Sequence, residues 1–110
     1  MTFSVRLKTD IWVSAEIRRC DTLFISAVVL HKGDAERGLV LIKQYVHAKG
    51  CKIYTQTRDF DDNLNWHQPL GEEWIEEAKA DAYVVKQRTF DEDLWVLEIE
   101  DAKGAYKPEI

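Results

Sequence analysis

The N-terminal part of the chain has the apolar spacing of a short amphipathic helix. Val13, Ile17 and Cys20 fall at positions i, i+4 and i+7, so they share one face of a helix over residues 11–20. Thr9 precedes this pattern and belongs to the residue types that cap helix N-termini. The spacing therefore predicts a helix whose apolar stripe packs against the core.

Three apolar runs follow this helix. Residues 23–31 are apolar on both alternating faces, a pattern typical of a central strand that is covered on both sides, or of a strand packed under helices. Residues 39–47 and 51–57 have the pattern of two further strands, joined by a tight turn at residues 48–50. A polar loop over residues 32–38 connects the first two runs. Closely spaced strands with glycine-containing turns predict an antiparallel meander.

The C-terminal half contains the second helix and the last strand. Residues 65–67 indicate a short edge strand, and residues 72–89 indicate a helix. Residues 94–99 form an apolar run between acidic residues, which predicts a strand in the interior of the sheet. We expect a loose tail over residues 102–110. The predicted helix stripe consists of Ile75, Ala78, Ala82 and Val85, and the predicted core residues of the last strand are Trp95, Leu97 and Ile99.

Together these elements predict an α+β fold in a single compact domain over residues 1–110, with two main helices and an antiparallel sheet of four to five strands. A chain of 110 residues is large enough for one core and too short for two. No apolar run is long enough to span a membrane. The N-terminus lacks the apolar stretch of a secretory signal, and two cysteines do not form a disulfide framework, so we expect a cytoplasmic location.

The net charge of −5 is distributed unevenly along the chain. Residues 1–58 hold ten basic and five acidic residues, whereas residues 59–110 hold five basic and fifteen acidic residues. One interpretation is two surfaces of opposite sign, suited to self-association or to an anionic partner. The other is that the two halves interleave in one small fold and their charges mix. The acidic balance argues against nucleic-acid binding.

Two loops have part of a ligand-binding motif. Gly33 and Gly38 have the glycine spacing of a phosphate-binding loop, but Leu39 stands where the motif requires lysine. Asp59 begins a run with the acidic spacing of a calcium loop, but Leu64 replaces the glycine that the sharp turn requires. The sequence therefore predicts no cofactor and no dedicated metal site.

The best candidate for chemistry is a group of carboxylates at the end of the last strand. Glu98 and Glu100 project from the same face of a strand, about 7 Å apart, a spacing that suits two carboxylates sharing a metal ion or a water molecule. With Asp101 they form the candidate site of a small metal-assisted hydrolase or nuclease. The alternative is a solvated strand end whose acids pair with basic residues. The candidates for such pairing are Arg6, Lys8 and Lys43.

The margin of the first helix is a candidate binding surface. Trp12 lies about 100° around the helix axis from the apolar stripe, on the same side as Glu16 and Arg19. Tryptophan and arginine are enriched at interface hot spots, so this surface suits a protein partner or a second copy of the chain. The alternative is that Trp12 covers the core, against Leu7 or the second helix.

Three blocks of the sequence resemble a family of small alphaproteobacterial proteins. They are RLKT at residues 6–9 with IWVSA at residues 11–15, KGDA at residues 32–35 with Gly38, and FDxDLWVxEIED at residues 90–101. The family is an uncharacterised domain of unknown function, so the resemblance implies no activity, cofactor, partner or site residue. The sequence as a whole predicts a small non-catalytic cytoplasmic protein that binds a protein partner or itself, with the hydrolase as the alternative.

Overall fold

The computed structural model describes residues 7–109, which form two helices and one five-stranded sheet. No helix in this part of the chain is long and apolar enough to cross a membrane. In chain order the elements are α1 (Thr9–Thr22), β1 (Ser26–His31), β2 (Val40–Val46), β3 (Gly50–Arg58), β4 (Leu64–His67), α2 (Glu77–Phe90) and β5 (Trp95–Glu100).

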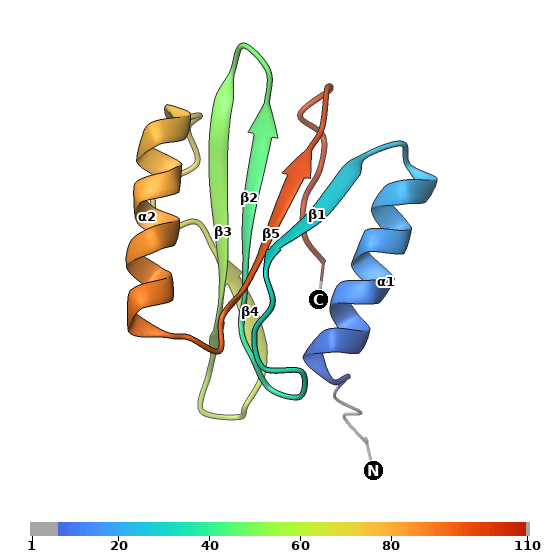
Figure 1. The fold of residues 1–110 in the computed structure, drawn as a ribbon, viewed down its shortest axis with the longest axis vertical. Helices are drawn as coiled ribbons and strands as arrows, with labels where there is room; N and C mark the ends of the chain where they lie inside the picture. The colour runs from blue at the N-terminus through green and yellow to red at the C-terminus, as the bar shows by residue number, and fades with distance from the viewer. Residues whose placement is uncertain (1–6, 110) are drawn as a thin grey trace.

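The strands of the sheet lie in the order β1-β5-β2-β3-β4. β2, β3 and β4 form an antiparallel meander, and β4 is the predicted short edge strand. The meander predicted over residues 23–31, 39–47 and 51–57 is wrong at its first strand, because β1 does not pair with β2. β5 is inserted between β1 and β2, antiparallel to β1 and parallel to β2 (Figure 1). The α+β fold with two helices and a largely antiparallel sheet is thus confirmed, and its single parallel pairing is a feature that the sequence pattern did not predict.

The prediction of a central strand over residues 23–31 is wrong. The strand begins only at Ser26, and it lies at the edge of the sheet with every second side chain exposed. Phe24 belongs to the turn that leaves α1, has a φ of 59° and is 99% exposed. Val28 and Leu30 are about half exposed, at 52% and 50%. Local periodicity identified apolar residues, but no neighbouring element covers this face.

The loop between β1 and β2 passes across β5, because these two strands are not neighbours. Gly33 and Gly38 are its points of closest approach: a Cβ atom at either position would clash with the carbonyl oxygen of Asp93. Their spacing, which resembled a phosphate-binding loop, is therefore required for packing against the segment that enters β5.

β5 is an interior strand, as predicted. Trp95, Leu97 and Ile99 are at most 4% exposed and belong to the core under α1, which we call the α1 face. Val96 is fully buried in a second core under α2, the α2 face. The sheet thus separates two cores, and the helices that cover them lie at opposite sides of it (Figure 1).

The predicted stripe of the second helix is wrong. α2 begins at Glu77, and its buried residues are Ala80 and Val84. Ile75 lies before the helix and forms an isolated β-bridge with Cys51, so it does not set the helical phase. The other three predicted positions are exposed: Ala78, Ala82 and Val85.

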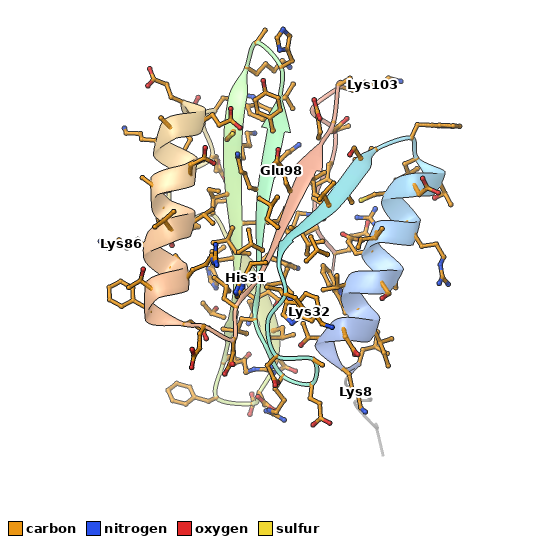
Figure 2. All side chains as sticks on the ribbon, in the orientation of Figure 1. Lys8, His31, Lys32, Lys86, Glu98 and Lys103 are labelled. Atoms are coloured by element: carbon orange, nitrogen blue, oxygen red, sulfur yellow. The ribbon has the colours of Figure 1, made fainter. Side chains whose placement is uncertain are left out.

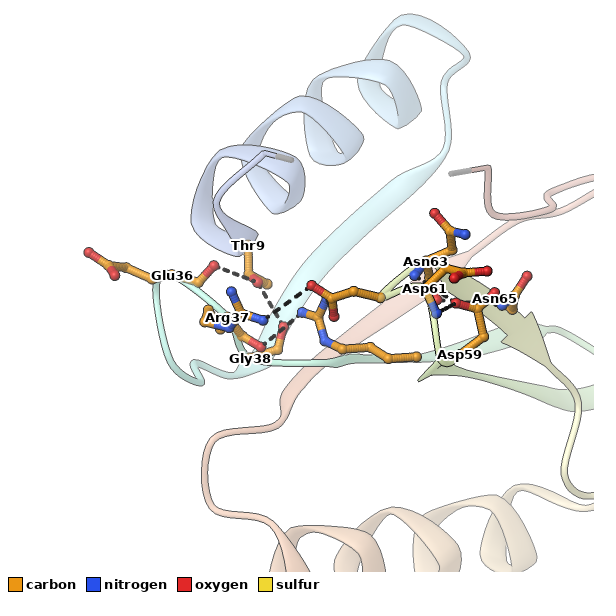
Figure 3. Close-up of polar contacts among 10 residues, drawn as sticks. Thr9, Glu36, Arg37, Gly38, Asp59, Asp61, Asn63 and Asn65 are labelled. Atoms are coloured by element: carbon orange, nitrogen blue, oxygen red, sulfur yellow. Dashed lines mark hydrogen bonds and ion pairs between the residues drawn. The ribbon is translucent and has the colours of Figure 1, made fainter. Parts of the chain in front are cut away.

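Thr9 is not the N-cap of α1, because it is itself the first helical residue and Lys8 is the cap. Its hydroxyl instead donates a hydrogen bond of 2.7 Å to the carbonyl oxygen of Gly38 (Figure 3). The backbone amides of Thr9 and Asp10 donate to the same loop, at Glu36 and Ala35. The start of α1 is thus fixed to the crossing loop between β1 and β2.

Candidate functional site

Trp12 lies at the margin of the α1 stripe and is partly buried. Its ring packs against Trp66 of β4, with the ring centroids 5.7 Å apart and the planes tilted by 42°. Trp12 therefore contacts the far edge of the sheet across the α1 face. Its role at an interface stays a prediction.

Glu16 is the centre of a buried hydrogen-bond network. It is only 5% exposed, and its carboxylate accepts two bonds from Arg19, of 2.6 and 2.9 Å, and one of 2.6 Å from the Tyr106 hydroxyl. Arg19 also donates to the carbonyl oxygen of Lys107. Burial, reinforced by the Glu16 bond, raises the pKa of Tyr106, and the Glu16 bond raises that of Arg19. The network joins the C-terminal segment to α1.

The prediction of a loose tail over residues 102–110 is therefore wrong for its described part. Tyr106 is 3% exposed and belongs to the α1-face core. Asp101 shapes the turn that leads to it, because its carboxylate accepts bonds from the amides of Lys103, at 3.0 Å, and Tyr106, at 2.7 Å. Asp101 is itself only 6% exposed. Residue 110 lies outside the described residues.

Glu98 lies on the α2 face, where it belongs to a second network, around the buried side chain of Lys43 in β2. The Lys43 ammonium is 3.8 Å from Glu98 and 2.7 Å from both Glu77 and Asp81 of α2. Burial alone would favour the neutral amine, but hydrogen bonds to Asp81 and Glu77 and the charge of Glu98 outweigh it and raise the pKa of Lys43. The interpretation that Glu98 pairs with Lys43 agrees with this geometry.

The three candidate acids therefore have different surroundings. Glu98 faces Lys43, Asp101 holds a turn, and Glu100 is exposed at the end of β5. Figure 2 shows Glu98 along the strand and Lys103 beyond its end. In residues 7–109, no three His, Cys, Asp or Glu side chains are arranged to hold a metal ion. A catalytic role for these acids stays a prediction.

The structure also shows the contacts of Lys8 and of the loop that begins at Asp59. Lys8 pairs with Glu36 at 3.9 Å, rather than with the acids of β5, and Arg6 lies outside the described residues. Asp59, the first residue of the apparent calcium loop, accepts hydrogen bonds from the amides of Asp61 and Asn63 (Figure 3). The bond from Asn63 is the main reason that the pKa of Asp59 is lowered. This loop is an acidic turn held by its own backbone.

The cysteines are free and lie in different cores, Cys20 under α1 and Cys51 under α2. Burial raises the pKa of each thiol to about 11. Both thiols are therefore protonated at neutral pH and behave as small apolar side chains.

An exposed apolar region lies at the junction of α1 and β1, which the sequence pattern did not single out. Phe24 stands between two grooves, of about 760 Å³ and 570 Å³, and contributes to both. The first groove runs between α1 and the start of β1, and the second runs between this junction and the C-terminal segment. The pair Leu23-Phe24, directly after the last turn of α1, is the signal that could have located it.

Comparison with known families finds one match. A family model described as "Protein of unknown function (DUF1491)" matches residues 7–107. No curated protein matches the chain.

Three solved structures with this fold illustrate the similarity. The crystal structure of a DUF1491 family protein from Caulobacter crescentus is 37% identical, with a TM-score of 0.77, and the match covers 87% of this chain and 89% of that one. An NMR structure of a DUF1491 family protein from Caulobacter crescentus is 37% identical over 92% and 91% of the two chains, with a TM-score of 0.81. A solution structure of a protein from A. tumefaciens is 25% identical over 96% and 100%, with a TM-score of 0.76.

Proposed function

We propose that this chain, which belongs to the DUF1491 family of proteins of unknown function, is a protein-binding module that meets its partner across α1 and β1. The observation that carries the proposal is the distribution of exposed apolar side chains. Nine large apolar residues are exposed in the described part of the chain, and six of them lie between residues 7 and 30. These six are Leu7, Ile11, Leu23, Phe24, Val28 and Leu30. Val28 and Leu30 project from β1 on the face opposite α1, because Val28 is paired with Glu98, so the surface continues around the open edge of the sheet.

Phe24 is the most prominent of the six. A non-glycine residue in the left-handed region costs about 1–3 kcal/mol, and Phe24 adopts a φ of 59° while its ring is 99% exposed. The left-handed conformation closes α1, because the amides of Phe24 and Ile25 donate to the carbonyl oxygens of Asp21 and Cys20. The exposure of the ring, in contrast, contributes nothing to folding stability. Binding to a partner provides a physical reason for the exposed ring, because an aromatic ring can anchor an interface between two grooves.

The open edge of β1 supports the same proposal. β5 is the only strand that pairs with β1 among the described residues. Edge strands are usually protected against pairing by charged residues, proline or bulges, but residues 26–30 contain no charge and no proline. A register shift is present only between Val29 and His31. The strand can therefore accept an additional strand from a partner.

A second copy of the chain is the first partner to test. An uncharged strand pairs with its own copy without placing like charges opposite each other. Of the residues predicted for this surface, Arg19 lines the second groove, while Trp12 and Glu16 mainly support the helix from within. The protonated, buried thiols agree with the proposed cytoplasmic location.

Sedimentation velocity at micromolar concentration tests the proposal. We expect wild-type protein to self-associate and Phe24→Ser to be monomeric with an unchanged melting temperature. Phe60→Ser is the matched control, because Phe60 is fully exposed in the loop between β3 and β4 and should leave association intact.

A wild-type monomer would exclude the homodimer. The proposal would then depend on co-purification from the native host, with a defined partner lost in Phe24→Ser and kept in Phe60→Ser. Equal recovery in both variants would contradict it.

A further inference from the structure

A pocket of about 350 Å³ lies on the α2 face, away from the proposed partner surface. It is bounded by the second half of α2 on one side and by β3 and β4 on the other. Leu41 and Leu94, both part of the buried α2-face core, provide apolar lining. The pocket is at the lower end of the range of volumes that hold small-molecule ligands in proteins.

Seven of the residues that line this pocket have polar side chains, and four of these form two matched pairs. Thr55 of β3 and His67 of β4 are directly opposite each other in the sheet. Tyr83 and Gln87 are four residues apart on α2 and therefore share one face of the helix. The two pairs come from opposite walls, so their polar groups can contact one bound molecule together.

These four polar groups are not used to hold the fold. Within residues 7–109, none of the four side chains donates or accepts a hydrogen bond. Elsewhere in the molecule, the charged groups of Glu16, Lys43 and Asp101 form hydrogen bonds or ion pairs with other groups of the same chain. Several unengaged polar groups above an apolar floor are the usual composition of a ligand site.

We propose that this pocket binds a small, uncharged, mostly apolar molecule that carries hydrogen-bonding groups. Its volume accommodates a molecule of one or two rings, since a cavity of roughly 150 Å³ already holds benzene. The apolar floor disfavours a charged ligand, because a charge placed over it would lose its hydration. The carboxylate of Asp91, which also lines the pocket, already accepts a hydrogen bond from the amide of Asp93.

An isosteric series of three probes tests both the site and the ligand class: benzamide is uncharged, benzoate is an anion and benzamidine is a cation. We follow amide NMR signals of the full chain as each probe is added to millimolar concentration. Benzamide should give saturable shifts at Thr55, Tyr83 and Gln87, and the two charged probes should bind at least about tenfold more weakly.

Two substitutions on α2 provide the matched comparison. Gln87→Trp fills the pocket and should abolish the benzamide shifts, whereas Val85→Trp, on an exposed position outside the pocket, should preserve them. If Gln87→Trp does not fold, His67→Ala tests the opposite wall and should weaken binding. Phe24→Ser should leave benzamide binding unchanged, so this result is independent of the proposed partner surface.

Three outcomes would overturn the proposal. They are the absence of saturable shifts with benzamide, shifts that persist in Gln87→Trp, and tighter binding of benzoate or benzamidine than of benzamide.

Discussion

Each face of the sheet has a network around a buried charged side chain, Glu16 or Lys43, and the two charges are held in different ways. On the α1 face, Glu16 is bonded by Arg19 and by the Tyr106 hydroxyl. On the α2 face, Lys43 is surrounded by three carboxylates of α2 and β5. Both charges are satisfied, but their partners differ in their access to water.

This difference determines what each network leaves behind when one member is lost. Glu77 and Asp81 are 48% and 56% exposed, so water can solvate them if Lys43 is removed. Glu16 and Tyr106 are both nearly buried, so a polar group left there cannot reach water. A buried polar group that loses its hydrogen-bond partner keeps the full cost of its removal from water. A partly exposed group that loses its partner is hydrated by solvent instead. The α1-face network should therefore contribute more to stability.

The largest effect is expected for Tyr106→Phe, which removes one donor from the buried carboxylate of Glu16. Hydrogen bonds to charged groups contribute about 1.5–3 kcal/mol, and we expect a loss of that size in urea unfolding. Tyr45→Phe is the control, because the Tyr45 hydroxyl makes no hydrogen bond to any described residue. Equal losses in both variants would show that the Glu16 bond adds nothing specific.

A smaller effect is expected for Lys43→Met, which keeps the apolar stem and removes the ammonium. The free energy of unfolding should fall by about 1 kcal/mol or less, because the carboxylates regain water. Lys79→Met, at an exposed position of α2, is the control and should leave the free energy of unfolding unchanged. A larger loss for Lys43→Met than for Tyr106→Phe would reverse the comparison between the two faces.

The smallest effect is expected from divalent cations. Because Glu98 faces Lys43 and Asp101 holds the turn before Tyr106, the two networks engage two of the three candidate acids. Millimolar Mg²⁺ or Mn²⁺ should leave the melting temperature unchanged. A site saturated at a hundred times its dissociation constant would add about 2.7 kcal/mol. A shift of that size, abolished by Glu100→Gln, would support the hydrolase alternative.

The sequence predicted the elements whose environment follows from local pattern. The run at residues 94–99 is apolar on both faces and lies between acids, and β5 is indeed interior. The same pattern failed at residues 23–31, because periodicity records which residues are apolar and not whether another element covers them. Ile75 misled the phase of the second helix for a similar reason, since it pairs with β3 before the helix begins.

The networks depended on contacts between distant parts of the chain. The period of a strand correctly placed Glu98 and Glu100 on one face, but Lys43 reaches Glu98 only because β2 and β5 pair in parallel. The bond between Glu16 and Tyr106 joins residues 90 positions apart. No local spacing contains that information, and a conserved pair of positions would have been needed to suggest it.

The insertion of β5 between β1 and β2 has a consequence for the order in which the protein can form during translation. Val28 pairs with Glu98, about seventy residues later in the chain. At roughly 5–20 residues per second, synthesis takes on the order of 4–14 s to deliver that partner. β2, β3 and β4 can pair as soon as they emerge, whereas β1 waits with both edges open. The newly made N-terminal segment is therefore the part of this protein that most needs protection by chaperones at the ribosome.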